Sequence, residues 1–325
     1  MPIPETVFIT GARGFIGRAL AHSYRQQGAV VSGIDFQADP EWGVLAGDLS
    51  EPETWSHALN GVELVIHTAA LVSNTASLDQ AWQVNVKGTA DLLEVCVDAG
   101  VKRFLQLSSV AAFGFQYPNQ VEENFPLRPM GNSYVDTKIA SEHAVLACHA
   151  SGRMECTIVR PGDVYGPGSK PWVVLPLEMM QQGKFVLPAR GEGIFSPVYI
   201  SDLVHGISLA ASLEAARGQI YTISGGAEVS CREFFSYHHK MLGGGARLRT
   251  TSTFVARTAA ICVGWVTRLL GGHSELGRGT IDMLSRVHGY SIAKARGQLG
   301  YEPTVSLDQG MQLTADWLRE QKLIS

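Results

Sequence analysis

A tyrosine and a lysine four residues apart occur twice in this chain. The segment NSYVDTKIA contains Tyr134 and Lys138, and the segment YSIAK contains Tyr290 and Lys294. A free tyrosine has a pKa of about 10 and is a poor base near neutral pH. A lysine ammonium group one helical turn away favours the phenolate, as does a place in the first turn of a helix. Either pair could therefore act as a base with its electrostatic helper, and the spacing alone does not choose between them.

The first half of the chain alternates short apolar runs with longer helical segments. β-branched runs predict strands, and apolar residues spaced three or four apart predict helices. This alternation indicates a doubly wound α/β fold, with a parallel sheet covered by helices on both faces. The expected strands are residues 6–10, 29–34, 62–68, 103–109 and 155–161, and the expected helices are residues 15–28, 78–99 and 133–150.

The alternation ends after Arg160. Residues 161–171 are rich in glycine and proline, which predicts a loop. Two further strands are expected at residues 195–200 and 219–224, with a helix between them, and the chain is mostly helical from residue 230 onward. The second region is therefore interleaved with the first rather than appended to it.

A glycine-rich loop lies between the first strand and the first helix. The segment ITGARGFIG contains Gly11, Gly14 and Gly17. Glycines let the backbone approach a pyrophosphate, and a helix N-terminus offers free N–H groups and a positive dipole end. Asp35 ends the second strand, where a carboxylate accepts ribose hydroxyls and repels a 2′-phosphate. We therefore predict a dinucleotide site that favours NAD, although Arg13 in the loop keeps NADP open as an alternative.

Two more segments contribute to this predicted site. Asp48 lies near the expected end of a third strand, where an acid can meet the adenine amine. Its alternative role is that of a residue in a helix N-terminal turn. The segment IHTAA, residues 66–70, ends the fourth strand in small residues that let a cofactor lie close.

The composition limits the class of protein and of partner. The chain has 325 residues and a net charge of −4, which suits one large α/β domain or two joined ones and gives no basic field for nucleic acid. Five scattered cysteines lack the spacing of a disulfide framework or a zinc site, so we expect no metal and a cytoplasmic protein. Residues 254–270 predict a core or lid helix, with weak contact with a membrane surface as the alternative.

A family resemblance follows from these motifs in their order. The segments TGARGFIG, GDLS, HTAA, NVKGT, SSVAAFG, YVDTK and RPGDVYGPG, together with Asp35, resemble the extended short-chain dehydrogenase/reductase family over nearly the whole chain. The resemblance implies a Rossmann-type doubly wound parallel sheet of about seven strands with a smaller, mostly helical C-terminal substrate region. It also implies a homodimer that packs through the helices carrying Asn85 and Tyr134. The predicted NAD-binding domain is residues 1–167, with residues 195–225 returning to it, and the predicted substrate region and lid are residues 168–194 and 226–325.

The same resemblance assigns roles to individual residues. It implies a catalytic group of Ser109, Tyr134 and Lys138, in which Lys138 also binds the nicotinamide ribose. Asn85 resembles the family asparagine that helps to order a water or the lysine, with a helix-capping or surface role as the alternative. The family tyrosine follows a strand that ends in serine, so the resemblance selects Tyr134 and leaves Tyr290 as structural. The cofactor-binding residues that it implies are Gly11, Arg13, Gly14, Phe15, Ile16, Gly17, Asp35, Asp48, Leu49, Thr68, Ala69, Ala70, Tyr134, Lys138, Pro161 and Val164.

The substrate is the least readable part of the prediction. Many sugar-nucleotide members of the family have an arginine where this chain has Phe195, and the segment FSPVYISDLVHGISLA is more similar to the 3β-hydroxysteroid and sterol-4α-carboxylate dehydrogenase branch. We therefore predict NAD-dependent interconversion of a secondary alcohol and a ketone on an apolar substrate. The alternatives are a sugar-nucleotide 4-epimerase or dehydratase and a non-catalytic NAD-sensing protein. The candidate substrate contacts are Phe113, Phe195 and Arg190, and Arg190 and Lys170 could meet a carboxylate or lie in solvent.

Overall fold

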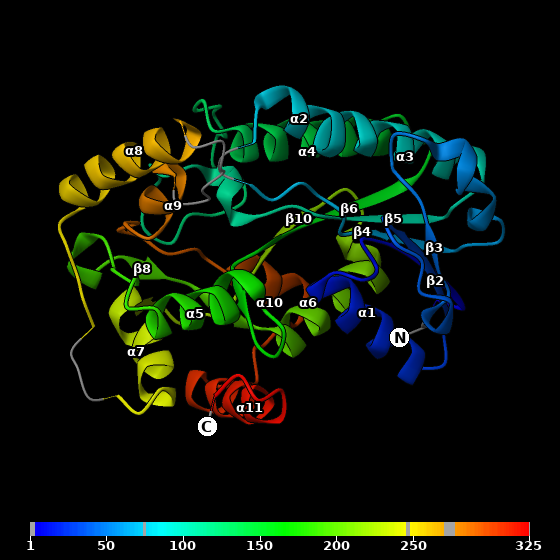
Figure 1. Cartoon of the computed structure of the whole chain (residues 1–325). Helices are drawn as coiled ribbons and strands as arrows, with labels where there is room; N and C mark the ends of the chain where they lie inside the picture. The colour runs from blue at the N-terminus through cyan, green and yellow to red at the C-terminus, as the bar shows by residue number, and fades with distance from the viewer. Residues whose placement is uncertain (1–3, 74–75, 245–247, 270–276, 325) are drawn as a thin grey trace.

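A seven-stranded parallel sheet forms the centre of the molecule (Figure 1). The computed structural model describes residues 4–73, 76–244, 248–269 and 277–324. The strand order is β10-β6-β5-β4-β1-β2-β3. From β1 the chain first adds β2 and β3 on one side, and it then returns to the other side of β1 to add β4, β5, β6 and β10, as in a doubly wound fold. The strands are β1 (Thr6–Thr10), β2 (Val30–Asp35), β3 (Val44–Ala46), β4 (Leu64–His67), β5 (Arg103–Leu107), β6 (Glu155–Pro161) and β10 (Ile220–Ile223).

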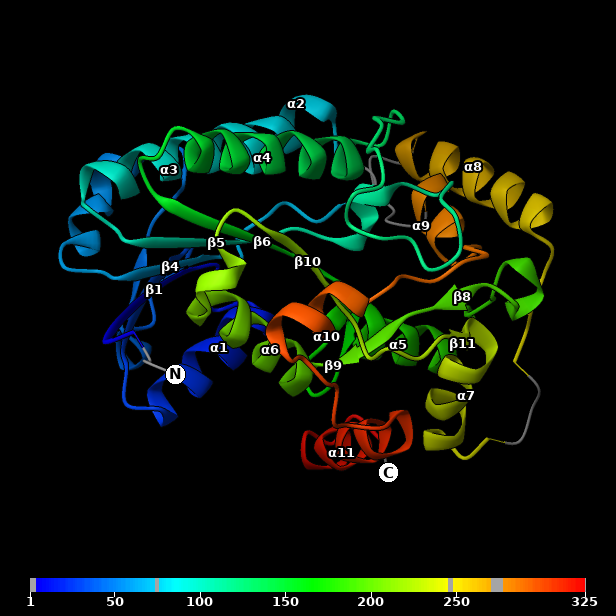
Figure 2. The same ribbon diagram turned by 180° about the vertical axis from the view of Figure 1, so that it is seen from behind.

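Helices cover both faces of this sheet (Figures 1 and 2). One face carries α2 (Leu78–Trp82), α3 (Gly88–Asp98) and α4 (Ser133–Ala150), and the other carries α1 (Phe15–Gln26), α6 (Ile200–Ser212) and α10 (Ala293–Leu299). The apolar strand residues alternate between the two faces, so that Ile9 and Ile66 pack towards α1 and α6 while Phe8 and Val65 pack towards α3 and α4. The predicted fold class is confirmed.

A smaller, mostly helical part lies beside the carboxyl ends of the strands. This part has an apolar core of its own, which includes Phe195, Phe234 and Phe235. Two short sheets pair β7 (Asp163–Tyr165) with β9 (Pro197–Tyr199) and β8 (Ile194–Phe195) with β11 (Val229–Ser230). The helices here are α5 (Leu175–Gln181), α7 (Cys231–Met241), α8 (Thr253–Leu269), α9 (Arg278–Met283) and α11 (Leu307–Glu320). Short 3-10 turns occupy Pro40–Trp42, Pro52–Thr54, Ser56–Leu59, Val110–Phe113, Ala189–Gly191 and Glu214–Ala216, and π-helical turns occupy Gln83–Lys87 and Lys170–Val174.

Two predicted elements differ in the structure. The strand expected at residues 195–200 is divided into β8 and β9, and neither belongs to the seven-stranded sheet. The division falls at Ser196, whose N–H donates to the Asp163 carboxylate at 2.9 Å and leaves the ladder there. The helix expected over residues 78–99 is interrupted by the π-helical turn Gln83–Lys87, which contains Asn85.

Residues 254–270, predicted to form a core or lid helix with weak membrane-surface contact as the alternative, correspond to α8, and residue 270 lies outside the described residues. Phe254, Val255 and Ile261 on this helix are exposed. Among the helices in the described part of the chain, none has the length and apolarity to cross a bilayer.

Candidate active site

The predicted site residues come from strands that end at the same edge of the sheet. β1, β4, β5 and β6 are parallel neighbours, so their carboxyl ends lie side by side. Gly11 follows β1, Thr68 follows β4 and Ser109 lies two residues beyond β5. Ligands of open α/β sheets bind at this edge, at the point where the strand order reverses.

The glycine loop is closely packed against the end of β4. Gly11 has φ +68°, and a Cβ atom there would lie 2.9 Å from the backbone N of Ala69. A Cβ atom on Gly17 would lie 2.2 Å from the carbonyl oxygen of Gly11. Gly14 is the N-cap of α1 and makes no side-chain cap hydrogen bond, so no capping side chain occupies the first N–H groups of the helix. This cradle fits a pyrophosphate group of NAD.

Asp35 and Arg13 are engaged with each other and with the neighbouring loop. The Asp35 carboxylate accepts the backbone N–H groups of Arg13 at 2.9 Å and Phe36 at 2.8 Å. The Arg13 guanidinium donates to Gln37 at 2.6 Å and lies 3.9 Å from Asp39. Asp35 is therefore fixed at the end of β2 with acceptor capacity remaining on both oxygens, while the cation beside it is directed towards the carboxamide and carboxylate of the next loop.

The other predicted cofactor residues surround the same edge. Asp48 lies beyond the end of β3, and its Oδ1 accepts both the N–H and the hydroxyl of Ser50 at 2.8 Å, which fixes a turn. Thr68 donates its hydroxyl to the Thr10 carbonyl at 2.7 Å. Phe15 and Ile16 open α1, Leu49 packs beside Gly88, Ala69 and Ala70 follow β4, Pro161 ends β6 and Val164 lies in β7. Their contacts with the cofactor stay predictions.

Ser109, Tyr134 and Lys138 are brought together as predicted. Tyr134 lies in the first turn of α4, and its hydroxyl hydrogen-bonds the side chain of Ser109. Lys138 lies one turn further on, with Nζ 5.9 Å from the centroid of the Tyr134 ring. Lys138 is buried and donates to the Leu107 carbonyl at 2.9 Å. Ser108, the other serine of the pair, is directed away, because its hydroxyl donates to Glu142.

The electrostatics of Tyr134 differ from the prediction. From the sequence, Lys138 and the helix N-terminus are expected to lower the pKa of the phenol. Burial instead raises the pKa of Tyr134, and the hydrogen bond from Ser109 opposes this only in part. Burial also lowers the pKa of Lys138 to about 8. The ammonium group lies over the ring and is held by a carbonyl, so desolvation outweighs its attraction for the phenolate.

Asn85 is neither a helix cap nor a surface residue. It is buried in the π-helical turn, and its Oδ1 accepts the N–H of Leu71 at 2.7 Å. Its Nδ2 donates to the Leu71 carbonyl and to Thr137 Oγ1, both at 3.1 Å. Thr137 precedes Lys138 on α4. Asn85 therefore connects the loop after β4 to the helix that carries the candidate catalytic lysine.

A buried histidine that the sequence argument missed supports this turn. His67, the last residue of β4, lies 2.7 Å from Thr10 Oγ1 through Nδ1 and 2.9 Å from Thr89 Oγ1 through Nε2. Thr89 donates its hydroxyl to the Asn85 carbonyl, so it accepts from His67 Nε2–H, and Thr10 donates to Nδ1. The chain of bonds joins the strand before the glycine loop to the π-helical turn. A histidine within the apolar run VELVIHT was the available signal.

Buried histidines predict a loss of stability in mild acid. Burial lowers the pKa of His67 to about 3 and that of His238 to about 4. Both pKa values lie below the unfolded value of about 6.5, so as the pH falls below 6.5 the unfolded state binds protons that the native state does not. We expect each histidine to remove about 1.4 kcal/mol of unfolding free energy per pH unit below 6.5. Urea denaturation between pH 7 and pH 5 measures this slope.

Single variants separate the two contributions. His67→Gln and His238→Gln should each reduce the slope by about 1.4 kcal/mol per pH unit, because a neutral amide has no proton to gain. His57 is exposed, and His57→Gln is the matched control, with an unchanged slope expected. An equal slope in all three variants would contradict the assignment.

The second tyrosine–lysine pair is not assembled into a site. Tyr290 is buried, and its hydroxyl contacts that of Tyr117 at 2.8 Å and the Arg286 guanidinium at 3.1 Å. Lys294 lies instead over the ring of Tyr221, 5.0 Å from its centroid. The two residues have different partners, which supports a structural role for Tyr290.

The candidate substrate residues lie in different environments. Phe113 is 4% exposed and packs between Arg160 and Tyr290, close to Ser109 in sequence. Phe195 is 0% exposed and packs on Trp172 and Phe234, so it belongs to the core of the smaller part rather than to an open wall. Two loop cations are exposed, Arg190 in the 3-10 turn Ala189–Gly191 and Lys170 at the start of a π-helical turn.

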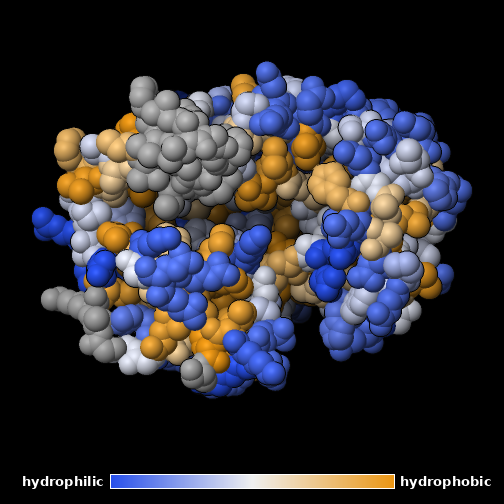
Figure 3. All heavy atoms as spheres, in the orientation of Figure 1, coloured by the Kyte–Doolittle hydropathy of each residue, from blue (hydrophilic) through white to orange (hydrophobic). Residues whose placement is uncertain are grey.

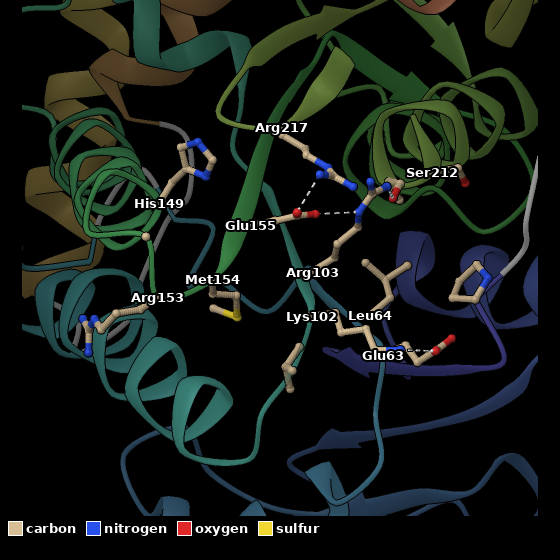
Figure 4. A pocket seen from close by; sticks show the side chains of 14 residues that line it. Glu63, Leu64, Lys102, Arg103, His149, Arg153, Met154, Glu155, Ser212 and Arg217 are labelled. Atoms are coloured by element: carbon tan, nitrogen blue, oxygen red, sulfur yellow. Dashed lines mark hydrogen bonds and ion pairs between the residues drawn. The ribbon is translucent and has the colours of Figure 1, made fainter. Parts of the chain in front are cut away.

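Figure 3 shows that the face seen in Figure 1 is hollowed between the layer of α2 and α4 and that of α1 and α5, with apolar side chains at the border. A separate hollow of about 600 Å³ lies at the opposite end of the sheet (Figure 4). Its lining includes Leu64, Arg103 and Glu155, the first residues of β4, β5 and β6. Glu155 pairs with Arg103 at 3.1 Å and with Arg217 at 2.8 Å, so each of these two cations has a carboxylate partner. This hollow is remote from the glycine loop and is not the cofactor site.

A comparison with known protein families identifies the family of the chain. Residues 7–224 match the model of the NAD dependent epimerase/dehydratase family. The chain belongs to this family. The resemblance to extended short-chain dehydrogenases/reductases is thereby confirmed, as is NAD as the cofactor. The protein is an NAD-dependent oxidoreductase of the epimerase/dehydratase family.

Proteins similar to this chain are named for, or were solved with, different small molecules. The 2-alkyl-3-oxoalkanoate reductase of Stenotrophomonas maltophilia (strain K279a) is 29% identical over 322 residues, which cover 94% of this chain and 97% of that protein. The 3-beta-hydroxysteroid dehydrogenase of Mycolicibacterium neoaurum is 27% identical over 327 residues, covering 94% and 89%. Among solved structures, MoeE5 in complex with UDP-glucose and NAD has a TM-score of 0.78 at 26% identity, covering 98% of this chain and 99% of that chain.

Proposed function

We propose that the protein interconverts a secondary alcohol and a ketone on an apolar substrate, either a 3β-hydroxysteroid or sterol or a 3-hydroxy/3-oxo acid. The observation that carries the reaction type is the Ser109–Tyr134 hydrogen bond, with Lys138 one helical turn away. When NAD is bound, it accepts a hydride from the alcohol carbon or its reduced form returns one. The residues of the chain handle the proton and the oxygen.

Each of the three side chains has a distinct task in this proposal. Tyr134 exchanges a proton with the substrate oxygen, and Ser109 hydrogen-bonds the same oxygen. Burial raises the pKa of Tyr134, so the neutral phenol is its resting form, which is the proton donor needed for ketone reduction. For alcohol oxidation the phenolate must form, and the positive charges of Lys138 and of the oxidised nicotinamide favour it.

The surroundings of Tyr134 support an apolar substrate. The ring packs beside a cluster of apolar residues that includes Val135 and Ile139, and Phe115 and Leu127 border the same cluster. The Phe195 side chain occupies the core where sugar-nucleotide relatives would need a cation. Two buried arginines in this region, Arg160 and Arg286, are held by Glu142 and Asp163. A diphosphate therefore finds no free cation at these positions, whereas a hydrophobic body suits the apolar surroundings.

A sugar-nucleotide 4-epimerase or dehydratase is the second candidate. The observation that favours it is the similarity to MoeE5, which was solved with UDP-glucose and NAD. The relatives named for steroid and oxoalkanoate chemistry support the first candidate instead. A non-catalytic NAD-sensing protein would have no need of the assembled Ser109, Tyr134 and Lys138.

A substrate screen separates these candidates. The purified protein is mixed with NAD or NADP and with a 3β-hydroxysteroid, a sterol carboxylate, a 2-alkyl-3-hydroxy acid or UDP-glucose, and cofactor reduction is followed by absorbance. UDP-glucose is assayed for epimerisation as well. We expect turnover of an apolar alcohol, with kcat/KM at least about tenfold higher with NAD than with NADP, because Asp35 repels a 2′-phosphate.

Each of the other outcomes would favour one of the two alternative functions. Turnover of UDP-glucose without turnover of any apolar alcohol would reverse the ranking of the two enzymatic functions. Binding of NAD without any turnover would favour the sensing protein.

A further inference from the structure

A fully buried carboxylate lies one helical turn beyond Lys138. Glu142 accepts Arg160 Nη2 through Oε2 at 2.6 Å and Arg160 Nε through Oε1 at 2.9 Å. Both side chains are 1% exposed. Oε1 also accepts the hydroxyl of Ser108 at 2.5 Å. A buried ion pair of this kind is weak support for stability by itself, since its desolvation offsets most of the attraction. A contribution to stability therefore does not explain why the Glu142–Arg160 ion pair lies beside Lys138.

The carboxylate belongs to a ladder of contacts between β5 and α4. Four consecutive residues, the last two of β5 and the two that follow it, each contact a residue on the inner face of the helix, where residues four apart lie one above the other. The pairs are Gln106 Nε2 with Ser141 Oγ at 2.7 Å, the Leu107 carbonyl with Lys138 Nζ at 2.9 Å, Ser108 Oγ with Glu142 Oε1 at 2.5 Å, and the side chain of Ser109 with the hydroxyl of Tyr134.

We propose that Glu142, held by Arg160, is a positioning residue that fixes the end of β5 against α4 and keeps Lys138 charged beside Tyr134. The inference rests on the proposed chemistry of Ser109, Tyr134 and Lys138. Arg160 lies near the end of β6, the neighbour of β5 in the sheet, so the ion pair anchors both strand ends to the helix. Ser108 and Ser109 are adjacent in the chain, so the bond of Ser108 to Glu142 also restricts the position of Ser109 beside Tyr134.

Glu142 also supplies the negative charge that Lys138 faces. Burial lowers the pKa of Lys138 to about 8, and the charge of Glu142 opposes that shift. From β4, His67 faces Lys138 in its neutral form, because burial lowers its pKa to about 3. From α4 itself, the Tyr134 ring lies beneath the ammonium group, and from β6, Arg160 is paired with the carboxylate. Glu142 is therefore the acidic group among the described side chains that favours the ammonium form.

The test uses two variants and a matched control. Glu142→Gln keeps the shape and removes the charge. The double variant Glu142→Leu with Arg160→Met removes both charges, and it keeps the test usable if Glu142→Gln fails to fold, since apolar replacement of a buried pair is well tolerated. Asp202→Asn is the control, because Asp202 is also a buried carboxylate with three hydrogen bonds, to Thr304 and Val305, but lies on α6.

Two readouts are measured on each folded variant. The first is the pKa of the Lys138 ammonium group, from NMR of lysine labelled with carbon-13, assigned with Lys138→Met. The second is the pH profile of kcat for the substrate found in the screen. We expect both Glu142 variants to lower the pKa of Lys138 by about one pH unit. The apparent pKa of the alkaline limb in the pH profile of kcat should fall by about the same amount. We also expect kcat to fall about tenfold, with the KM for NAD within about twofold of wild type.

The outcomes separate this proposal from the proposed function. An unchanged Lys138 pKa in the folded Glu142 variants, or an equal shift in Asp202→Asn, would overturn the positioning role. If wild type turns over none of the substrates, the proposed function fails, and the NMR readout still decides the role of Glu142.

Discussion

We expect Tyr134→Phe to lower kcat by about 10³-fold, the largest effect of any single hydroxyl in the protein. The phenol is the group positioned to exchange a proton with the substrate oxygen, and phenylalanine keeps the ring while removing that proton. The affinity for NAD should stay within about threefold of wild type, because Gly11, Gly14 and Asp35 remain in place. Steady-state kinetics on the substrate found in the screen and fluorescence titration with NADH measure the two quantities.

The second tyrosine of the repeated pattern supplies the control for this experiment. Tyr290→Phe removes a buried hydroxyl that contacts Tyr117 and Arg286. It should lower the free energy of unfolding by about 1–3 kcal/mol and leave kcat within about threefold, since a buried polar partner is lost but no proton-transfer group. Tyr134→Phe should show the reverse pattern. Equal kcat in wild type and Tyr134→Phe would remove Tyr134 from the mechanism.

The cofactor half of the site was predictable because its signals are local. A β-branched strand, a glycine turn and an amphipathic helix follow one another within residues 6–26, and β1 and α1 occupy that span as expected. Asp35 ends β2 and Tyr134 opens α4, where hydrophobic periodicity placed them. Each of these positions depends on a short window of sequence, so packing elsewhere in the chain had little influence on it.

The charge states of Tyr134 and Lys138 were not predictable in the same way. The sequence places Lys138 one turn from Tyr134, but whether the phenol is acidified depends on how deeply the pair is buried and on what else holds the ammonium group. Those facts come from the packing of β5 against α4, which buries the pair and places the Leu107 carbonyl against the lysine. The pairing of Glu142 with Arg160 joins a helix to a strand, and nothing in the local sequence of either residue indicates it.

Irregular backbone was also hidden from the sequence. The π-helical turn at Gln83–Lys87 adds one residue to a turn without breaking the apolar pattern on either side. A single helix over residues 78–99 was therefore the natural prediction. The turn is where Asn85 contacts both Leu71 and Thr137. Such π-helical turns are frequent at functional sites. The division of β8 from β9 has a similar cause, since Asp163 takes the Ser196 N–H out of the ladder.

We expect Gly17→Ala to weaken NAD binding by about 100-fold and to lower the free energy of unfolding by about 3 kcal/mol. A Cβ atom at this position would lie 2.2 Å from the carbonyl oxygen of Gly11, a backbone atom that cannot rotate away. The phosphate loop must therefore move from the helix N-terminus that it borders. Isothermal titration with NAD and urea denaturation measure the two losses.

A second helical glycine supplies the control for Gly17→Ala. Gly297 lies in the interior of α10, and a Cβ atom added there would have no heavy atom within 4 Å. Gly297→Ala should therefore raise the free energy of unfolding by up to about 1 kcal/mol and leave the affinity for NAD unchanged. Since both substitutions add one methyl group to a helix, equal effects in the two variants would show that helix propensity, and not the close approach of the loop, explains the need for glycine at position 17.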